Sequence, residues 1–111
     1  MMAWVYLLIA GIFEVGFTTS LKLSENFSNG FYTVSFFICA TISFGLLVIA
    51  TKYIPLGTAY AVWTGVGAFG TALVGIIFFA DPVTVGRIVF LGLLIGSVIG
   101  LKLASPDKGV L

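Results

Sequence analysis

The sequence predicts an all-α integral membrane protein with four transmembrane helices. Of its 111 residues, 60% are hydrophobic and only 8% are charged, whereas about a quarter of the residues in an average soluble protein are charged. The apolar residues gather into four long runs, each close to the roughly 20 residues that a helix needs to cross a bilayer. A soluble bundle of this size would have too few polar residues to cover its own surface.

Short polar segments separate the four apolar runs. The predicted helices span about residues 3–23, 31–51, 57–80 and 85–103 of a single transmembrane domain, 1–111. Turn-forming residues from Ser24 to Gly30 end the first helix, Lys52 to Pro55 end the second, and Asp81-Pro82 ends the third. No basic leader precedes the first run, so we expect it to be a retained span rather than a cleaved signal.

The composition argues against several classes of function. Five basic and four acidic residues give a net charge near zero, which offers little to a nucleic acid. Histidine is absent and Cys39 is the only cysteine, so the parts of a zinc site or of a Ser-His or Cys-His pair are missing. We therefore expect no enzyme activity, no metal and no cofactor.

The basic residues are divided almost evenly between the two sides of the membrane. An even number of spans puts Lys52, Lys102 and Lys108 on the side of the termini, and Lys22 and Arg87 on the other side. An excess of basic residues usually marks the cytoplasmic side, so this near-tie leaves a single orientation and a dual orientation equally open. Lys22 and Lys102 stand near helix ends, where long side chains commonly extend to the interface.

Glu14 is the ionisable residue that the first helix places deep in the membrane. It lies roughly 15 Å along the helix at 1.5 Å per residue, near the bilayer midplane. An ionisable group at this depth is costly, and it usually faces a cavity and binds a proton, an ion or a substrate. Because burial disfavours an unneutralised carboxylate, protons and an organic cation would compete for it. In a protein that alternates access between two faces, this competition drives cation export by proton exchange.

Residues expected on the neighbouring helices suit a cation site. Tyr60 and Trp63 share a helix face with Gly67; aromatic rings attract cations, and Tyr60 can hydrogen-bond the carboxylate. Tyr and Trp in membrane proteins are often interfacial anchors, but the depth of this pair favours a binding role. Ser43 lies near the midplane, where its hydroxyl either faces the site or bonds its own helix backbone.

Two groups of glycines predict either flexibility or close helix packing. Gly65 and Gly67 could form a hinge in the third helix or a packing contact. Gly92, Gly96 and Gly100 recur every four residues in the fourth helix, which is typical of a face that another helix approaches closely. Whether that helix belongs to the same subunit or to another is left open. Four helices barely enclose a polar pathway, so we expect an oligomer.

Two segments of the chain resemble the small multidrug resistance family of bacterial exporters. One runs from Ala10 to Val15 as AGIFEV, followed by Leu21-Lys22, and the other is PLGTAYAVWTGVG at residues 55–67. The resemblance covers essentially the whole chain. It implies a proton-coupled antiporter of the bacterial inner membrane that works as an antiparallel dimer. In that dimer, Glu14 of each subunit would contribute to one shared site, lined also by Tyr60, Trp63 and Ser43.

The substrate preference depends on features that point to two branches of this family. Thr58 and Thr64-Gly65 resemble the guanidinium exporter branch, which typically carries a tryptophan at the position of Phe17. Residues 18–27 look more like the branch that exports quaternary ammonium compounds. We favour guanidinium or guanidinyl compounds, with quaternary ammonium and other multidrug cations as the alternative. We expect a homodimer in the lipid bilayer; the alternatives are one subunit of a heteromeric transporter and a non-transporting assembly subunit.

Overall fold

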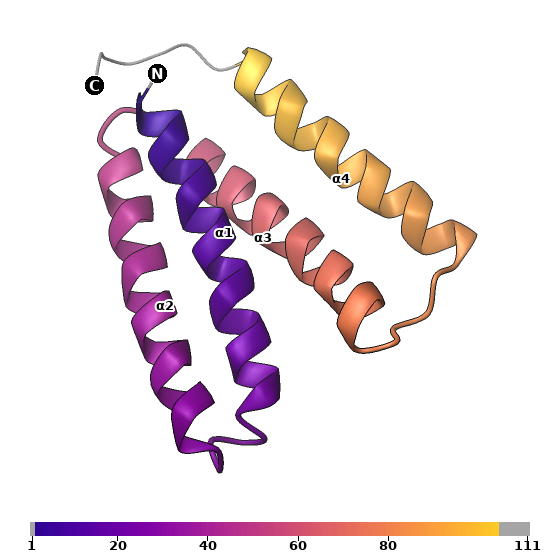
Figure 1. Cartoon of the computed structure of the whole chain (residues 1–111). Coiled ribbons are helices and arrows are strands. Elements are labelled where there is room, and N and C mark those ends of the chain that lie inside the picture. The colour runs from indigo at the N-terminus through magenta and orange to yellow at the C-terminus, as the bar shows by residue number, and fades with distance from the viewer. Residues whose placement is uncertain (1, 105–111) are drawn as a thin grey trace.

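Four α-helices joined by short turns make up the computed structural model, which describes residues 2–104 (Figure 1). They are α1 (Met2–Leu23), α2 (Gly30–Ala50), α3 (Leu56–Phe78) and α4 (Val85–Ala104). Each is long and apolar enough to cross a membrane, which confirms the prediction of four spans. The start of α1 and the end of α4 lie at the same end of the molecule (Figure 1). Lys108 lies outside the described residues.

Side chains at the turns satisfy the free backbone groups where α2 and α4 begin. The side-chain oxygen of Asn29 accepts a hydrogen bond of 3.3 Å from the Tyr32 backbone N–H at the start of α2. The hydroxyl of Thr84 accepts one of 3.1 Å from the Arg87 backbone N–H at the start of α4. Both contacts are N-caps, which supply partners to N–H groups that the helix itself leaves unpaired.

Helix α3 ends at Phe78, before the predicted end at Ala80. The carbonyl of Gly75 accepts hydrogen bonds from the backbone N–H groups of both Phe79 and Asp81, each at 3.0 Å. Ala80 between them takes a positive φ of 56°, a conformation that does not continue a right-handed helix. The chain therefore leaves the helix before it reaches the proline that we expected to break it.

Helix α1 lies between α2 and α3 and is the central helix of the subunit (Figure 1). The apolar core surrounds the half of α1 nearest the termini, where Leu7, Ala10 and Val62 are fully buried and Trp63 is almost so. All buried apolar side chains among residues 2–104 belong to this half of α1, α2 and α3 or, in the case of Ile54, to the turn between α2 and α3. The terminal half is therefore packed mainly through apolar side chains, whereas the loop-side half also carries hydroxyl contacts between helices.

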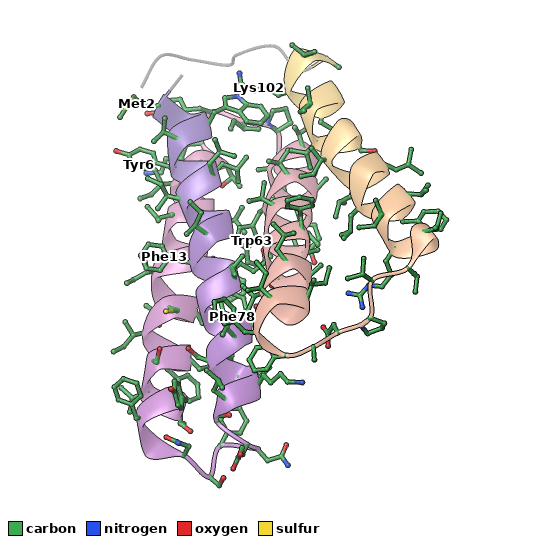
Figure 2. All side chains as sticks on the ribbon, turned by 45° about the vertical axis from the view of Figure 1, so that its right-hand side comes forward. Met2, Tyr6, Phe13, Trp63, Phe78 and Lys102 are labelled. Carbon is green, nitrogen blue, oxygen red and sulfur yellow. The ribbon has the colours of Figure 1, made fainter. Side chains whose placement is uncertain are left out.

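Helix α4 packs mainly against α3 and leaves most of its own surface open. Across Val85–Ala104 no residue is buried. Leu94 and Val98 face Gly65 of α3. Near the terminal end, the Lys102 ammonium lies 4.8 Å from the centre of the Trp4 ring, and Figure 2 shows Lys102 at the same end as Met2.

Candidate functional site

The carboxyl group of Glu14 lies between α1 and α3 and packs against Gly67. A Cβ atom at Gly67 would overlap both Cδ and Oε1 of Glu14, so only a glycine leaves room for the carboxyl group in this position. Within residues 2–104, Glu14 Oε1 is the one buried side-chain nitrogen or oxygen that has no hydrogen-bond partner. An unpaired buried oxygen is costly, so this is where a proton or a cationic ligand would be stabilised most.

Ser43 and Trp63 form a buried hydrogen-bonded link between three helices. The indole N–H of Trp63 on α3 donates to Ser43 Oγ on α2 at 2.9 Å, and Ser43 Oγ donates to the Ala10 carbonyl on α1 at 2.7 Å. Ala10 lies about one turn before Glu14 on the same helix. The Ser43 hydroxyl therefore bonds a neighbouring helix rather than its own backbone, and it ties the three site-bearing helices together at one level.

Phe17 belongs to a cluster of aromatic rings beside this link. Its ring centre lies 6.5 Å from that of Trp63 and 6.0 Å from that of Phe44, on which it stacks. The Tyr60 ring lies 5.8 Å from Trp63 but is 57% exposed, and Glu14 Oε1 accepts no hydrogen bond from it. The structure thus brings Phe17, Ser43 and Trp63 together and leaves Tyr60 at the open edge.

The proposed hinge glycines of α3, Gly65 and Gly67, are both covered by side chains of other helices. A Cβ atom at Gly65 would lie 2.7 Å from Val98 Cγ2 of α4, and one at Gly67 would overlap the carboxyl group of Glu14. Both glycines lie within an unbroken helix. Close packing against α4 and α1 explains why these two positions are glycine. The hinge role stays a prediction.

The glycine stripe of α4, formed by Gly92, Gly96 and Gly100, is uncovered. A Cβ atom at any of the three would meet no atom within 4 Å among residues 2–104. At 100° per residue the stripe lies on the face of α4 opposite Leu94 and Val98, which contact α3. The stripe therefore does not pack within the described part of this subunit.

A second polar contact beside Glu14 was missed by sequence reasoning. Thr18 Oγ1 on α1 and Thr71 Oγ1 on α3 lie 2.7 Å apart and share a hydrogen bond. Thr18 follows Glu14 by four residues, and Thr71 follows Gly67 by four. Because α1 and α3 run in the same direction, equal steps along the two helices keep residues at the same level. That shared spacing is the signal by which the pair could have been found.

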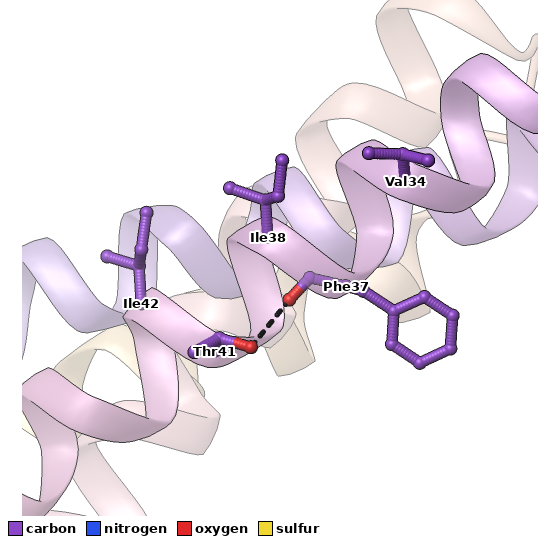
Figure 3. A pocket seen from close by; sticks show the side chains of 5 residues that line it. All are labelled: Val34, Phe37, Ile38, Thr41 and Ile42. Atoms are coloured by element: carbon purple, nitrogen blue, oxygen red, sulfur yellow. Dashed lines mark hydrogen bonds between the residues drawn. The ribbon is translucent and has the colours of Figure 1, made fainter.

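A hollow on the outer face of α2 lacks the chemistry of a binding site. Its volume is about 390 Å³. It is lined by Val34, Phe37, Ile38, Thr41 and Ile42 (Figure 3). The hydroxyl of Thr41, the one polar group of these five side chains, already donates to the Phe37 carbonyl of its own helix at 2.8 Å. The hollow is an apolar groove on one helix.

The chain is similar to known proteins over most of its length. Residues 2–94 match the model of the family described as Small Multidrug Resistance protein. A guanidinium exporter of Yersinia pseudotuberculosis serotype I (strain IP32953) is 46% identical over 104 residues, which are 94% of this chain and 100% of that protein. Guanidinium exporters of Salmonella typhimurium (strain LT2) and Proteus vulgaris are 41% and 39% identical over 94% of this chain, and the matches cover 99% and 100% of those proteins.

Proposed function

Because this chain belongs to the small multidrug resistance family, we propose that it exports guanidinium and guanidinyl compounds in exchange for protons. It is a multi-pass protein of the bacterial inner membrane. Its relatives are named as exporters, which are transporters rather than enzymes, and their names support the substrate class. The observation that carries the proposal is the buried Oε1 of Glu14, which has no hydrogen-bond partner within residues 2–104.

Glu14 is the residue at which the cation and the proton compete. An unneutralised carboxylate is unfavourable in the membrane interior, so the group carries either a proton or the charge of a bound cation. Guanidinium is planar and can donate two parallel N–H bonds to one carboxylate. Protonation removes the negative charge and releases the cation, whereas cation binding releases the proton. Alternating access to the two faces of the membrane converts this competition into exchange.

The aromatic and hydroxyl groups near Glu14 have separate tasks in this mechanism. Trp63 and Ser43 hold each other through their hydrogen bond of 2.9 Å, which fixes the orientation of the indole ring. Phe17, Trp63 and Tyr60 supply ring faces that attract a desolvated cation. Tyr60, which is 57% exposed, supplies its ring at the open edge of this group.

We propose that the working unit is an antiparallel homodimer. The stripe of Gly92, Gly96 and Gly100 has nothing against it within residues 2–104, and small-residue stripes favour close contact between membrane helices. A second copy packed there would cover α4, and in the proposed dimer Glu14 of both copies belongs to one shared site. The near-equal share of basic residues on the two sides agrees with insertion in both orientations.

Quaternary ammonium export is the second candidate. The ring cluster of Phe17, Phe44 and Trp63 favours it, because Phe17 brings a ring face without a hydrogen-bond donor. Transport of guanidinium and tetraethylammonium is compared at the same proton gradient. Faster exchange of guanidinium supports the first candidate, and faster exchange of tetraethylammonium favours the second.

Proton-driven uptake into proteoliposomes tests the proposed function. With the vesicle interior more acidic than the outside, guanidinium should accumulate inside as protons leave, and Glu14→Gln should abolish the accumulation. Glu25→Gln is the matched control, because Glu25 is an exposed carboxylate of the α1–α2 turn. Uptake that ignores the proton gradient, or that survives Glu14→Gln, would contradict the mechanism.

A further inference from the structure

A small polar cavity lies between the loop-side ends of α1 and α3 and the segment that leads to α4. Its volume is about 70 Å³, well above the roughly 10–15 Å³ that admits one water molecule. The lining residues that matter here are Thr18, Lys22, Thr71, Gly75, Phe79 and Asp81. We call this cavity the loop-side pocket. It lies outside the cluster of Phe17, Ser43 and Trp63.

The loop-side pocket is stacked directly on the Glu14 site. Along α1 and α3, the carboxyl group of Glu14 packs on Gly67, and one turn further Thr18 and Thr71 share their hydrogen bond of 2.7 Å. The two threonines also line the pocket. They therefore form a partition of two hydroxyl groups between the pocket and the buried carboxyl group.

The other wall of the loop-side pocket has the chemistry of a cation site. The carboxylate of Asp81 lies against Gly75, where a Cβ atom would overlap Asp81 Oδ2. The Lys22 ammonium lies 5.0 Å from the centre of the Phe79 ring, within the range of a cation–π contact. The pocket is thus lined by a ring face, a carboxylate and one cationic group, tethered to α1, that already lies over the ring.

The loop-side route to Glu14 passes polar groups, whereas the apolar core lies on the terminal side of the site. Leu7, Ala10 and Val62 are fully buried on the terminal side of the site, whereas the loop side offers the pocket and one hydroxyl pair. A hydroxyl pair can exchange its hydrogen bond for one to a passing N–H donor. On the terminal side, the buried hydroxyl of Ser43 is already held by its hydrogen bonds with Trp63 and Ala10.

We propose that the loop-side pocket is a second binding site for small planar cations of the guanidinium class. A cation that arrives from the loop side displaces the Lys22 ammonium, binds between Asp81 and Phe79, and passes the hydroxyl pair to reach Glu14. The limited volume selects against cations that carry several long alkyl groups. The role of this pocket in transport rests on the proposed function, but cation binding to the pocket can be tested without any transport measurement.

Binding to the full-length Glu14→Gln protein isolates the second site, because the central carboxylate is then absent. Methylguanidinium is the probe, observed through its methyl protons by saturation-transfer NMR in lipid nanodiscs. We expect binding to persist in Glu14→Gln and to weaken about tenfold when Asp81→Asn is added, since a charge-assisted contact is lost. Adding Glu25→Gln instead removes the same charge from the same side of the membrane and should leave binding unchanged. Equal binding by the two double variants would overturn the proposal.

A substitution that should strengthen binding excludes misfolding as the cause of the change, because a misfolded protein would bind less. In the Glu14→Gln protein, Lys22→Gln removes the tethered competitor and should strengthen methylguanidinium binding several-fold. Arg87→Gln removes a positive charge from the same side of the membrane and should not. A stronger signal in both, or in neither, would show that the Lys22 ammonium does not occupy the site.

Failure of this site and failure of the proposed function are distinguishable. If the native protein exchanges guanidinium for protons while Asp81→Asn and Glu25→Gln bind alike in the Glu14→Gln protein, the second site is wrong and the function stands. If the native protein transports no guanidinium while Asp81-dependent binding persists, the proposed function is wrong and the site stands.

Discussion

The carboxyl group of Glu14 occupies the space beside Gly67 where any other residue would place its Cβ atom. The contact joins α1 to α3 at the level of the buried oxygen that has no hydrogen-bond partner within residues 2–104. Gly67 thereby determines where the carboxyl group stands, although it has no chemistry of its own.

Gly67→Ala should therefore displace the carboxyl group and weaken guanidinium binding by about tenfold, since the cost of overpacking a tight contact is typically about 1–3 kcal/mol. Calorimetric titration of the purified protein with guanidinium would measure the change. Gly45→Ala is the matched control, because a Cβ atom at Gly45 meets nothing within 4 Å. Native affinity in Gly67→Ala would show that the carboxyl group does not depend on this space.

Ser43→Ala should lower the stability of the protein. It removes the acceptor of the Trp63 indole N–H, and a buried donor left unpaired costs about 1–3 kcal/mol. Thermal unfolding in detergent, followed by helical circular dichroism, would report the loss. Thr41→Ala serves as control, because its hydroxyl bonds its own helix on the exposed face of α2 (Figure 3). Equal melting temperatures for the two variants would contradict the role of the link.

Phe17→Trp should shift transport toward guanidinium and away from tetraethylammonium. The larger indole fills space beside Phe44 and Trp63 and adds an N–H donor, which disfavours a bulky cation by about tenfold if a few methylene groups no longer fit. The ratio of the two exchange rates in proteoliposomes is the measurement. Phe13→Trp makes the same change one turn earlier on α1 and should leave the ratio as it is. A ratio that moves equally in both variants would locate selectivity elsewhere.

Gly96→Leu should weaken dimerisation without unfolding the subunit. The side chain would project from the uncovered stripe of α4, where nothing lies within 4 Å among residues 2–104, so no contact among these residues is disturbed and the change acts on the proposed contact with another copy. We expect a shift of the monomer–dimer equilibrium by about 1–3 kcal/mol, as for overpacking. Energy transfer between labelled subunits would follow it. Ser97→Leu, to the side of the stripe, is the control, and an unchanged equilibrium in Gly96→Leu would remove the stripe from the interface.

The helices of this protein could be predicted from sequence because bilayer thickness sets their length. The largest departure is the end of α3, which closes at Phe78 through hydrogen bonds to the Gly75 carbonyl. Those bonds depend on the path of the following residues, and Ala80 has no sequence feature that announces its positive φ of 56°. Helix-breaking residues such as Asp81-Pro82 set the furthest point that a helix can reach, but the helix can end several residues earlier, as α3 does at Phe78.

The sequence predicts which residues belong to the site better than it predicts which of them contact one another. Depth along the helix singled out Glu14, Ser43 and Trp63, but the hydrogen bond from Trp63 to Ser43 depends on how three helices rotate against one another. The same rotation leaves Tyr60 more than half exposed and brings Thr18 to Thr71. Helical periodicity assigns residues to a face, whereas tertiary packing decides which faces meet.

The separation of α4 from the site has a consequence for how such a protein can evolve. The residues proposed to bind cations lie on α1, α2, α3 and the segment after α3, whereas Leu94 and Val98 of α4 contact α3 at Gly65, which is not one of them. After a gene duplication, substitutions on the open face of α4 can change which subunit pairs with which, while the cation-binding residues of the chain stay the same. In the proposed dimer, the surface that selects the partner and the residues of this chain that bind the cation can therefore change independently.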